Sequence, residues 1–226
     1  MVRAVVFDFD GVILETEGPE YRAWEEIFRA HRARLTMEEW GAAIGTTGGF
    51  DPYRALLGRA RGPVAGEDRV RAAQQARVDE LLAASEPLPG VLTWLDAAAR
   101  LDLSLAVAST SSADWVAGHL AVLGVAERFA CLSCGDRETV PKPAPDLYLR
   151  ACACLGVRPG AAVAVEDSAH GVAAATAAGL FTVAVPHALT RSMDLSRAQL
   201  LVSSLEEVSL SEVVALAEAW AGGAQG

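Results

Sequence analysis

The chain has 226 residues, of which 52% are hydrophobic, and it carries a formal net charge of -10. Its length allows one large domain or a domain with an insertion, and no stretch approaches the ~18 consecutive apolar residues of a membrane span. The negative charge argues against non-specific nucleic-acid binding, which needs a basic surface. We therefore expect no nucleic-acid or membrane partner. Because Met1 leads almost directly into the first apolar run, we also expect a cytoplasmic protein without a signal peptide.

Short apolar runs that are typical of buried strands recur along the chain. They lie at 4–7, 103–108, 129–133, 161–165, 181–185 and 200–202. Helical patterns separate most of them, at 91–101, 114–123, 144–155 and 169–178. Continuous apolar strands that alternate with helices predict an α/β fold with a doubly wound parallel sheet, a Rossmann-like core. Residues 220–226 lose the helical period and are expected to form a frayed tail.

The stretch between the first two strand-like runs breaks this alternation. It contains helix signals, such as the long polar pattern at 67–82, and no convincing strand. Such a segment does not fit the alternation of strands and helices, so we expect an inserted small helical cap at 15–88. The catalytic core would then consist of 1–14 and 89–226. The Pro87-Leu88-Pro89-Gly90 turn marks the return to the core.

The four cysteines form two closely spaced pairs, Cys131 with Cys134 and Cys152 with Cys154. Such pairs can bind structural zinc. The first pair, however, lies on an apolar, strand-like stretch, and buried free cysteines behave as small hydrophobic residues. Disulfides are rare in cytosolic proteins. We therefore expect four free cysteines and neither zinc nor a disulfide.

Polar residues follow the ends of several predicted strands, where the ligands of parallel sheets bind. Asp8 and Asp10 follow the first strand. An Asp-x-Asp at this place is often a turn or a helix N-cap, but two buried carboxylates so close together repel each other unless a cation is present. A bound metal ion would explain them. The other residues at this edge are Ser109, Thr110, Glu166 and Asp167, and Lys142 stands between two prolines.

Each of these residues also has an ordinary structural interpretation. Ser109 could be an N-cap and Lys142 a solvated loop lysine. Ser168 is expected to cap a helix, and His170 is expected to pack or lie on the surface. We nevertheless favour a functional role for Ser109 and Lys142, because the same chain also carries the acidic residues at the other strand ends.

The order and spacing of four motifs resemble the haloacid dehalogenase superfamily, in the branch whose small helical cap follows the first strand. The motifs are Asp8-Phe9-Asp10-Gly11-Val12, Ser109-Thr110, Lys142-Pro143 and Glu166-Asp167. The resemblance covers nearly the whole chain. It implies phosphoryl transfer through an aspartyl-phosphate intermediate, with Asp8 as the nucleophile and Asp10 as the general acid and base.

The same resemblance implies a cofactor and a phosphate site. Mg²⁺ would bind Asp8, the main-chain carbonyl of Asp10, Asp167 and, directly or through water, Glu166. Ser109 and the backbone N–H of Thr110 would hold phosphoryl oxygens, and Lys142 would offset the negative charge of Asp8 and the phosphate.

Asp10 favours a phosphate ester as the substrate, because dehalogenases and phosphonate hydrolases of this fold lack the second aspartate. A mutase is the main alternative, since 8–13, Thr16 and 22–24 resemble β-phosphoglucomutase. Glu20, however, stands where that mutase carries a histidine, and the loop at 45–49 lacks its phosphate-gripping arginine. We predict a phosphatase of a small phosphorylated metabolite such as a sugar phosphate. A non-catalytic phospho-ligand binding module is a weaker alternative.

The cap is expected to recognise the leaving group of the substrate. Six cap residues are candidates for this role: Glu20, Trp40, Thr46, Thr47, Phe50 and Arg54. Trp40 and Phe50 could equally belong to the interior of the cap. The sequence does not indicate which metabolite is bound, or the oligomeric state.

Overall fold

The structure is a computed structural model that describes residues 1–41, 50–135 and 139–223. The chain divides into two compact units. The core unit consists of Met1–Leu14 and Glu86–Gly226, and the cap unit of Glu15–Ser85. Two of the candidate substrate-reading residues, Thr46 and Thr47, lie outside the described residues, as does the loop at 45–49.

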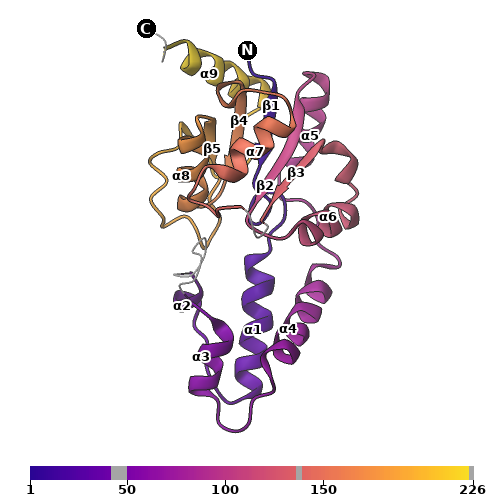
Figure 1. The fold of residues 1–226 in the computed structure, drawn as a ribbon, viewed down its shortest axis with the longest axis vertical. Helices are drawn as coiled ribbons and strands as arrows, with labels where there is room; N and C mark the ends of the chain where they lie inside the picture. Colours follow the sequence, from indigo (N-terminus) through magenta and orange to yellow (C-terminus); the bar gives the residue numbers. More distant parts are fainter. Residues whose placement is uncertain (42–49, 136–138, 224–226) are drawn as a thin grey trace. The chain divides into compact units, whose positions relative to one another are not determined.

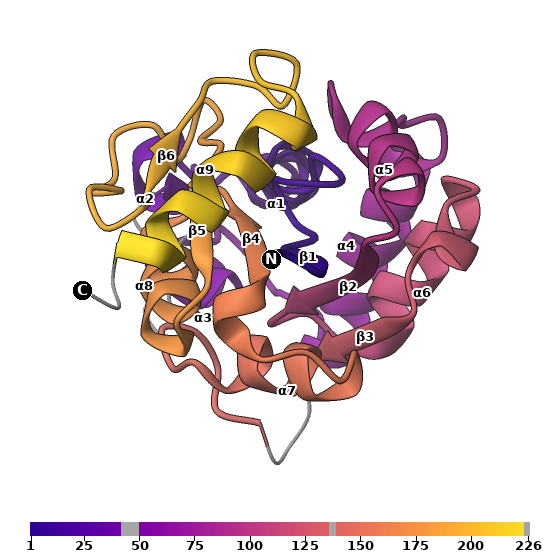
Figure 2. The ribbon, with the colours of Figure 1, turned by 90° about the horizontal axis from the view of Figure 1, so that it is seen from above.

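The core unit is built on a six-stranded parallel sheet with the strand order β3-β2-β1-β4-β5-β6 (Figures 1 and 2). The strands are β1 (Ala4–Phe7), β2 (Ser104–Ser109), β3 (Cys131–Cys134), β4 (Ala162–Glu166), β5 (Phe181–Ala184) and β6 (Leu200–Leu201). The helices are α5 (Val91–Arg100), α6 (Ala113–Val122), α7 (Asp146–Cys154), α8 (Ala169–Ala178) and α9 (Leu210–Gly223). The predicted parallel α/β fold with a helical insertion is confirmed.

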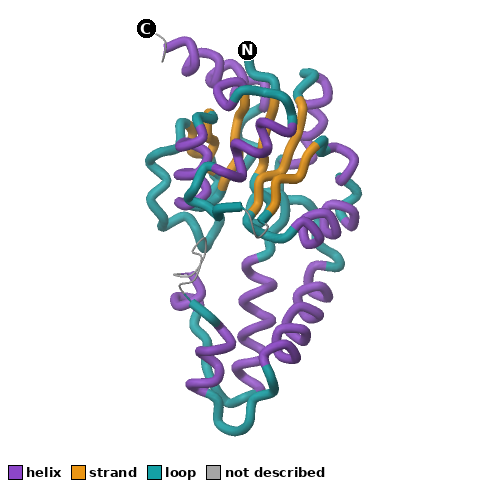
Figure 3. The backbone as a smooth tube through the Cα atoms, viewed as in Figure 1, coloured by secondary structure: helices purple, strands orange, loops and turns teal. Residues whose placement is uncertain are grey.

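Helices cover both faces of this sheet (Figure 3). Helices α7 and α8 pack on the face to which β1 contributes Ala4 and Val6, in a cluster rich in alanine. Small side chains allow the helices to approach the strands closely. On the opposite face, the ring of Phe7 meets Trp94 of α5 edge-on, with the ring centroids 6.4 Å apart. Burial on both faces explains why the strands are apolar throughout instead of alternating.

Residues 220–223 are helical, which the sequence did not indicate. Trp220 lies within α9, and its ring packs edge-on against Phe181 of β5 with the centroids 5.8 Å apart. Leu210, Val213 and Ala217 of the same helix are buried. The expectation of a frayed tail from residue 220 is therefore wrong for residues 220–223, because contacts with the sheet and core hold this helix.

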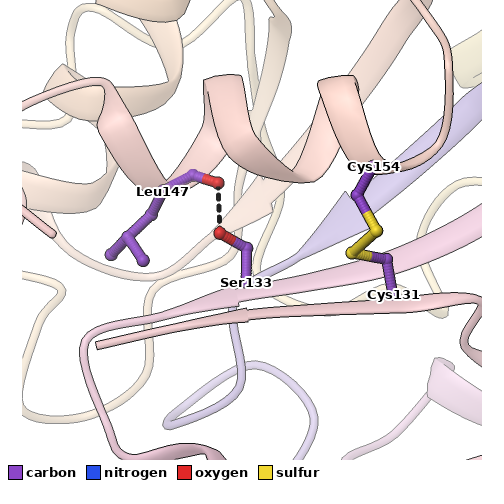
Figure 4. Close-up of a disulfide and its surroundings, with 4 residues drawn as sticks. All are labelled: Cys131, Ser133, Leu147 and Cys154. Atoms are coloured by element: carbon purple, nitrogen blue, oxygen red, sulfur yellow. Dashed lines mark hydrogen bonds between the residues drawn. A yellow bond between two sulfur atoms is a disulfide. The ribbon is translucent and has the colours of Figure 1, made fainter. Parts of the chain in front are cut away.

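The expectation of four free cysteines is also wrong. Cys131 of β3 and Cys154 of α7 form a disulfide, and their Cα atoms are 6.3 Å apart (Figure 4). The hydroxyl of Ser133 donates to the Leu147 carbonyl at 2.8 Å and links the same two elements. The packing of α7 along β3 brings the two sulfurs together, although 23 positions separate them in the sequence. Cys134 and Cys152 are free and buried.

A thiol count tests this arrangement. Burial raises the pKa of both Cys134 and Cys152 to about 11, so their thiols stay protonated and unreactive near pH 8. We expect the native, unreduced protein to react slowly with a thiol reagent. Unfolding without a reductant should expose the two free thiols, and unfolding with a reductant all four. Four thiols in the unfolded, unreduced protein would contradict the disulfide.

The cap unit contains α1 (Glu17–Ala30), α2 (Met37–Gly41), α3 (Pro52–Arg59) and α4 (Glu67–Leu82). Trp40 is buried, and its indole N–H donates to the Glu17 carboxylate at 3.0 Å, so it belongs to the interior of the cap. Arg54 is exposed, and its Nε lies 3.5 Å from Oδ2 of Asp51, the N-cap residue of α3. Over the described ranges, no helix has both the length and the apolar character needed to cross a membrane.

Candidate active site

The site lies where the strand order reverses. Strands β2 and β3 follow on one side of β1, and strands β4, β5 and β6 follow on the other. Strand β1 lies between β2 and β4, and Phe7 pairs with Val107 on one side and Val165 on the other. Asp8 and Glu166, the next residues, therefore sit at the same level on adjacent strands. Such a switch point, beyond the carboxyl ends of the strands, is the usual ligand site of an open α/β sheet.

Three buried carboxylates meet at this point: Asp8, Glu166 and Asp167. One carboxylate oxygen from each lies within 4.8 Å of the others. The ammonium of Lys142 is 2.8 Å from Asp8 Oδ1 and 2.6 Å from Glu166 Oε1, and only 6% of this side chain is exposed. Lys142 is the single lysine of the sequence. Its ammonium is a compact charge that pairs with both carboxylates at once.

This lysine does not fully offset the negative charge around it. Burial and the charge of Glu166 raise the pKa of Asp8, even though Lys142 acts in the opposite direction. Burial also raises the pKa of Asp167, against the effect of His187. Burial lowers the pKa of Lys142, but the charges of Asp8 and Glu166 outweigh this effect and raise it. The cluster is therefore suited to a further cation.

Glu166 is held by several hydrogen-bond donors besides Lys142. The phenol of Tyr148 on α7 donates to Oε1 at 2.7 Å, and the Asp167 N–H donates to Oε2 at 3.1 Å. The hydroxyl of Ser168 also donates to Oε2, at 3.3 Å. Tyr148 was missed in the sequence because it lies inside an ordinary apolar helix pattern. Ser168 caps α8 as expected, accepting from the Gly171 N–H at 3.1 Å.

Asp167 has a histidine partner that the sequence analysis missed. His187 Nε2 lies 3.0 Å from Asp167 Oδ2. His187 comes shortly after β5, and a polar residue beyond a strand end was the signal that could have identified it. Gly11 passes close by with a φ of +81°, and a Cβ there would lie 2.6 Å from Asp167 Oδ2. Glycine is therefore needed both for the backbone conformation and for the space.

The Asp10 carboxylate lies beside the end of β2 and the start of α6. It accepts hydrogen bonds from the hydroxyl of Ser111 at 2.6 Å, the indole of Trp115 at 3.1 Å and the hydroxyl of Ser109 at 3.3 Å. Ser109 is the last residue of β2 and is not a helix cap; Ser112 caps α6 instead. Thr110 follows Ser109 directly and is exposed. The sequence analysis assigned no role to Ser111 or Trp115.

The donor set fits a hard divalent cation. The carboxylates of Asp8, Glu166 and Asp167 supply only oxygen ligands. Magnesium prefers such ligands, whereas zinc favours sites with histidine or cysteine. The residues present therefore suit Mg²⁺.

A family model described as haloacid dehalogenase-like hydrolase matches residues 2–179. The chain belongs to this family. It is 36% identical to the protein named "Putative phosphatase YhcW" of Bacillus subtilis (strain 168), over 93% of this chain and 96% of that protein. It is 29% identical to validoxylamine A 7'-phosphate phosphatase of Streptomyces hygroscopicus subsp. limoneus, over 92% and 96% of the two chains.

Solved structures agree with this assignment. CbbY from Rhodobacter sphaeroides has been crystallised with phosphate and, as a mutant, with xylulose-(1,5)bisphosphate; the TM-scores to this chain are 0.79 and 0.80. Both share 32% sequence identity with it and cover 93% of this chain and 98% of the other. The predicted family and the prediction of a hydrolase are confirmed, and the relatives of the chain include phosphatases.

Proposed function

We propose that this haloacid dehalogenase-like hydrolase is a phosphatase that cleaves the phosphate ester of a small metabolite through an aspartyl-phosphate on Asp8. The observation that carries the proposal is the position of Asp8. Its carboxylate leaves the central strand at the switch point, 2.8 Å from a buried lysine and among two further carboxylates. A carboxylate nucleophile and concentrated positive charge are what phosphoryl transfer requires.

The roles of the neighbouring residues follow from this assignment. Asp8 attacks phosphorus, and the bond to the leaving oxygen breaks as Asp10 gives that oxygen a proton. Water then cleaves the aspartyl-phosphate and returns a proton to Asp10. Ser109 and the N–H of Thr110 are assigned to the phosphoryl oxygens, and Lys142 to the charge of Asp8 and the phosphate.

Magnesium is the proposed cofactor, with Asp8, Asp167, the Asp10 carbonyl and Glu166 as the residues that hold it. The bound ion would neutralise charge on the phosphoryl group. The oxygens of Glu166 already accept bonds from Lys142, Tyr148, the Asp167 N–H and Ser168. Asp8 and Asp167 are therefore assigned as the main ligands.

A sugar phosphate is the proposed substrate class. CbbY, which shares 32% identity with this chain, has been crystallised with a sugar bisphosphate. The cap unit is proposed to select among such substrates by fit, since the residues assigned to bond making all belong to the core unit.

A product analysis tests the function directly. The protein with Mg²⁺ is incubated with p-nitrophenyl phosphate, xylulose 1,5-bisphosphate and β-glucose 1-phosphate, and both inorganic phosphate and sugar products are quantified. Release of inorganic phosphate is the expected result. Conversion of β-glucose 1-phosphate to glucose 6-phosphate without phosphate release would show a mutase. Binding of these esters without turnover of any of them would show a binding module.

The Asp10→Asn substitution should slow the reaction in a way that depends on the leaving group. The amide cannot donate an acidic proton, so esters of alcohols should lose about 10²- to 10⁴-fold in kcat. p-Nitrophenolate needs little protonation, so p-nitrophenyl phosphate should lose much less. The comparison of kcat for the two esters provides the measurement. An equal loss for both would contradict a general-acid role.

Magnesium should stabilise the folded protein as well as activate it. A ligand that binds only the folded state adds about 2.7 kcal/mol at 100 times its Kd, which a thermal melt can detect. Asp167→Asn should remove most of this shift, whereas Asp194→Asn, at an exposed position, should leave it unchanged. Ca²⁺ should inhibit, because it accepts more ligands in looser geometry than Mg²⁺. Full activity in excess chelator would refute the metal site.

A further inference from the structure

Trp115 reaches the Asp10 carboxylate from the first turn of α6. Ser112 caps this helix, and its hydroxyl accepts from the Trp115 backbone N–H at 3.3 Å. The cap fixes the backbone of the first turn, and the indole N–H then donates to Asp10 Oδ1 at 3.1 Å. Asp10 comes from the loop after β1, so this bond joins two segments that lie 105 positions apart in the sequence.

The indole ring is itself held in place. His119, one turn further along α6, packs against it with the ring centroids 4.0 Å apart and the ring planes tilted by 49°. The His119 ring nitrogen Nδ1 lies 2.9 Å from the Trp115 carbonyl oxygen, and its ring lies 6.2 Å from that of Phe9. Trp115 is only half-buried, yet it has contacts that limit its rotation.

The hydrogen bonds from Ser109, Ser111 and Trp115 reach different oxygens of the Asp10 carboxylate. Ser111 and Ser109 both donate to Oδ2, whereas the Trp115 indole N–H donates to Oδ1. A donor on Oδ1, opposite the two serine hydroxyls on Oδ2, restrains rotation of the carboxyl plane about the Cβ–Cγ bond. Proton transfer depends on such alignment, because small misplacements of a catalytic group cost rate steeply.

We propose that Trp115 is a positioning residue that orients the Asp10 carboxyl for proton transfer. This inference rests on the proposed function, in which Asp10 protonates the leaving oxygen and later takes a proton from water. Trp115 does not touch the phosphoryl group in this assignment. It acts through Asp10 alone. Its effect on kcat should therefore be larger for leaving groups that need a proton than for those that do not.

Trp115→Phe tests the proposal, since it removes the N–H and keeps an aromatic ring beside His119. We expect kcat for a sugar phosphate to fall about tenfold with little change in KM, because a misaligned acid slows bond cleavage without weakening substrate binding. Hydrolysis of p-nitrophenyl phosphate should change less than about twofold. Trp220→Phe makes the same substitution in α9, and this control should leave both rates unchanged.

A double-mutant cycle shows whether Trp115 acts through Asp10. In an Asp10→Ala background the Trp115→Phe substitution should cost nothing further, because its acceptor is gone. Equal losses for the two esters, or a full tenfold loss in the Asp10→Ala background, would overturn the proposal. A rise in the sugar phosphate rate on Trp115→Phe would also overturn it, because the indole would then restrain Asp10 away from its working position.

An NMR readout separates this inference from the proposed function. Trp115→Phe identifies the Trp115 indole N–H signal in a ¹H–¹⁵N spectrum, and a hydrogen bond to a carboxylate should place that signal downfield. Asp10→Ala should move it upfield, with or without turnover of any ester. An unmoved signal would overturn the contact. Failure of the proposed function would show differently, as a wild-type protein that hydrolyses no phosphate ester while the indole signal still responds to Asp10.

Discussion

Replacing Asp8 with asparagine is expected to lower kcat by at least about 10³-fold for every phosphate ester, since the amide is nearly isosteric but cannot attack phosphorus. Steady-state hydrolysis of p-nitrophenyl phosphate and of a sugar phosphate provides the measurement. Unlike Asp10→Asn, this change should affect both esters alike. Asp114→Asn, at an exposed position of α6, is the matched control and should retain wild-type rates.

The stability of the same variant gives an independent result. Because burial and Glu166 raise the pKa of Asp8 in the folded protein, the ionised carboxylate is disfavoured by folding. The resulting loss in the free energy of unfolding is absent at pH values below the pKa of Asp8 in the unfolded chain. It is complete at pH values above the pKa of Asp8 in the folded protein. At pH values above the folded pKa, Asp8→Asn should therefore melt no earlier than the wild type without Mg²⁺, and it should lose the stabilisation by Mg²⁺. Retained activity, with the substitution verified by mass, would exclude Asp8 as the nucleophile.

Gly171→Ala should have the second large effect, although it replaces none of the proposed catalytic residues. Gly171 lies in the first turn of α8, and a Cβ there would overlap the carboxylate of Glu166. Glu166 would have to move away from Lys142 and Tyr148. We expect a loss of about 1–3 kcal/mol in stability from overpacking and about 10- to 100-fold in activity or Mg²⁺ affinity.

Gly118→Ala is the control for this substitution. Gly118 lies inside α6, and a Cβ there meets nothing within 4 Å. Alanine is the better helix former, so this variant should be as stable as the wild type or up to about 1 kcal/mol more stable, with unchanged activity. Thermal melts and Mg²⁺ titrations of both variants give the comparison. A Gly171→Ala protein that behaves like Gly118→Ala would show that Glu166 does not need its observed position.

The strands were predictable because each is a short apolar run between breaks. The run at 4–7 matches β1, and that at 161–165 differs from β4 (Ala162–Glu166) by one residue at each end. The run at 129–133 starts before β3 (Cys131–Cys134). Phe129 belongs to the apolar run because it packs against the core, although it lies outside the strand. Its ring packs on Phe7, with the centroids 6.2 Å apart, outside the strand.

Long-range pairing decided what the sequence pattern did not show. Cys131 and Cys154 looked like apolar core residues until the packing of α7 on β3 brought them together. Helix α9 is rich in small residues, and its order depends on contacts such as that between Trp220 and Phe181. Neither feature has a local signal, because both depend on which elements become neighbours.

Some residues of the candidate site were predictable from the sequence and others were not. Asp8, Ser109 and Glu166 were recognisable in the sequence because parallel strands bring their carboxyl ends to one edge, so a polar residue after each apolar run already has a position. Tyr148, Trp115 and His187 come from helices and a turn that reach the site from the side, and the residues they contact are 18, 105 and 20 positions away. The strand-end residues were therefore predictable from the sequence, because their placement follows from backbone hydrogen bonding. The side chains that orient them were not, because their contacts depend on how the helices and loops pack around the sheet.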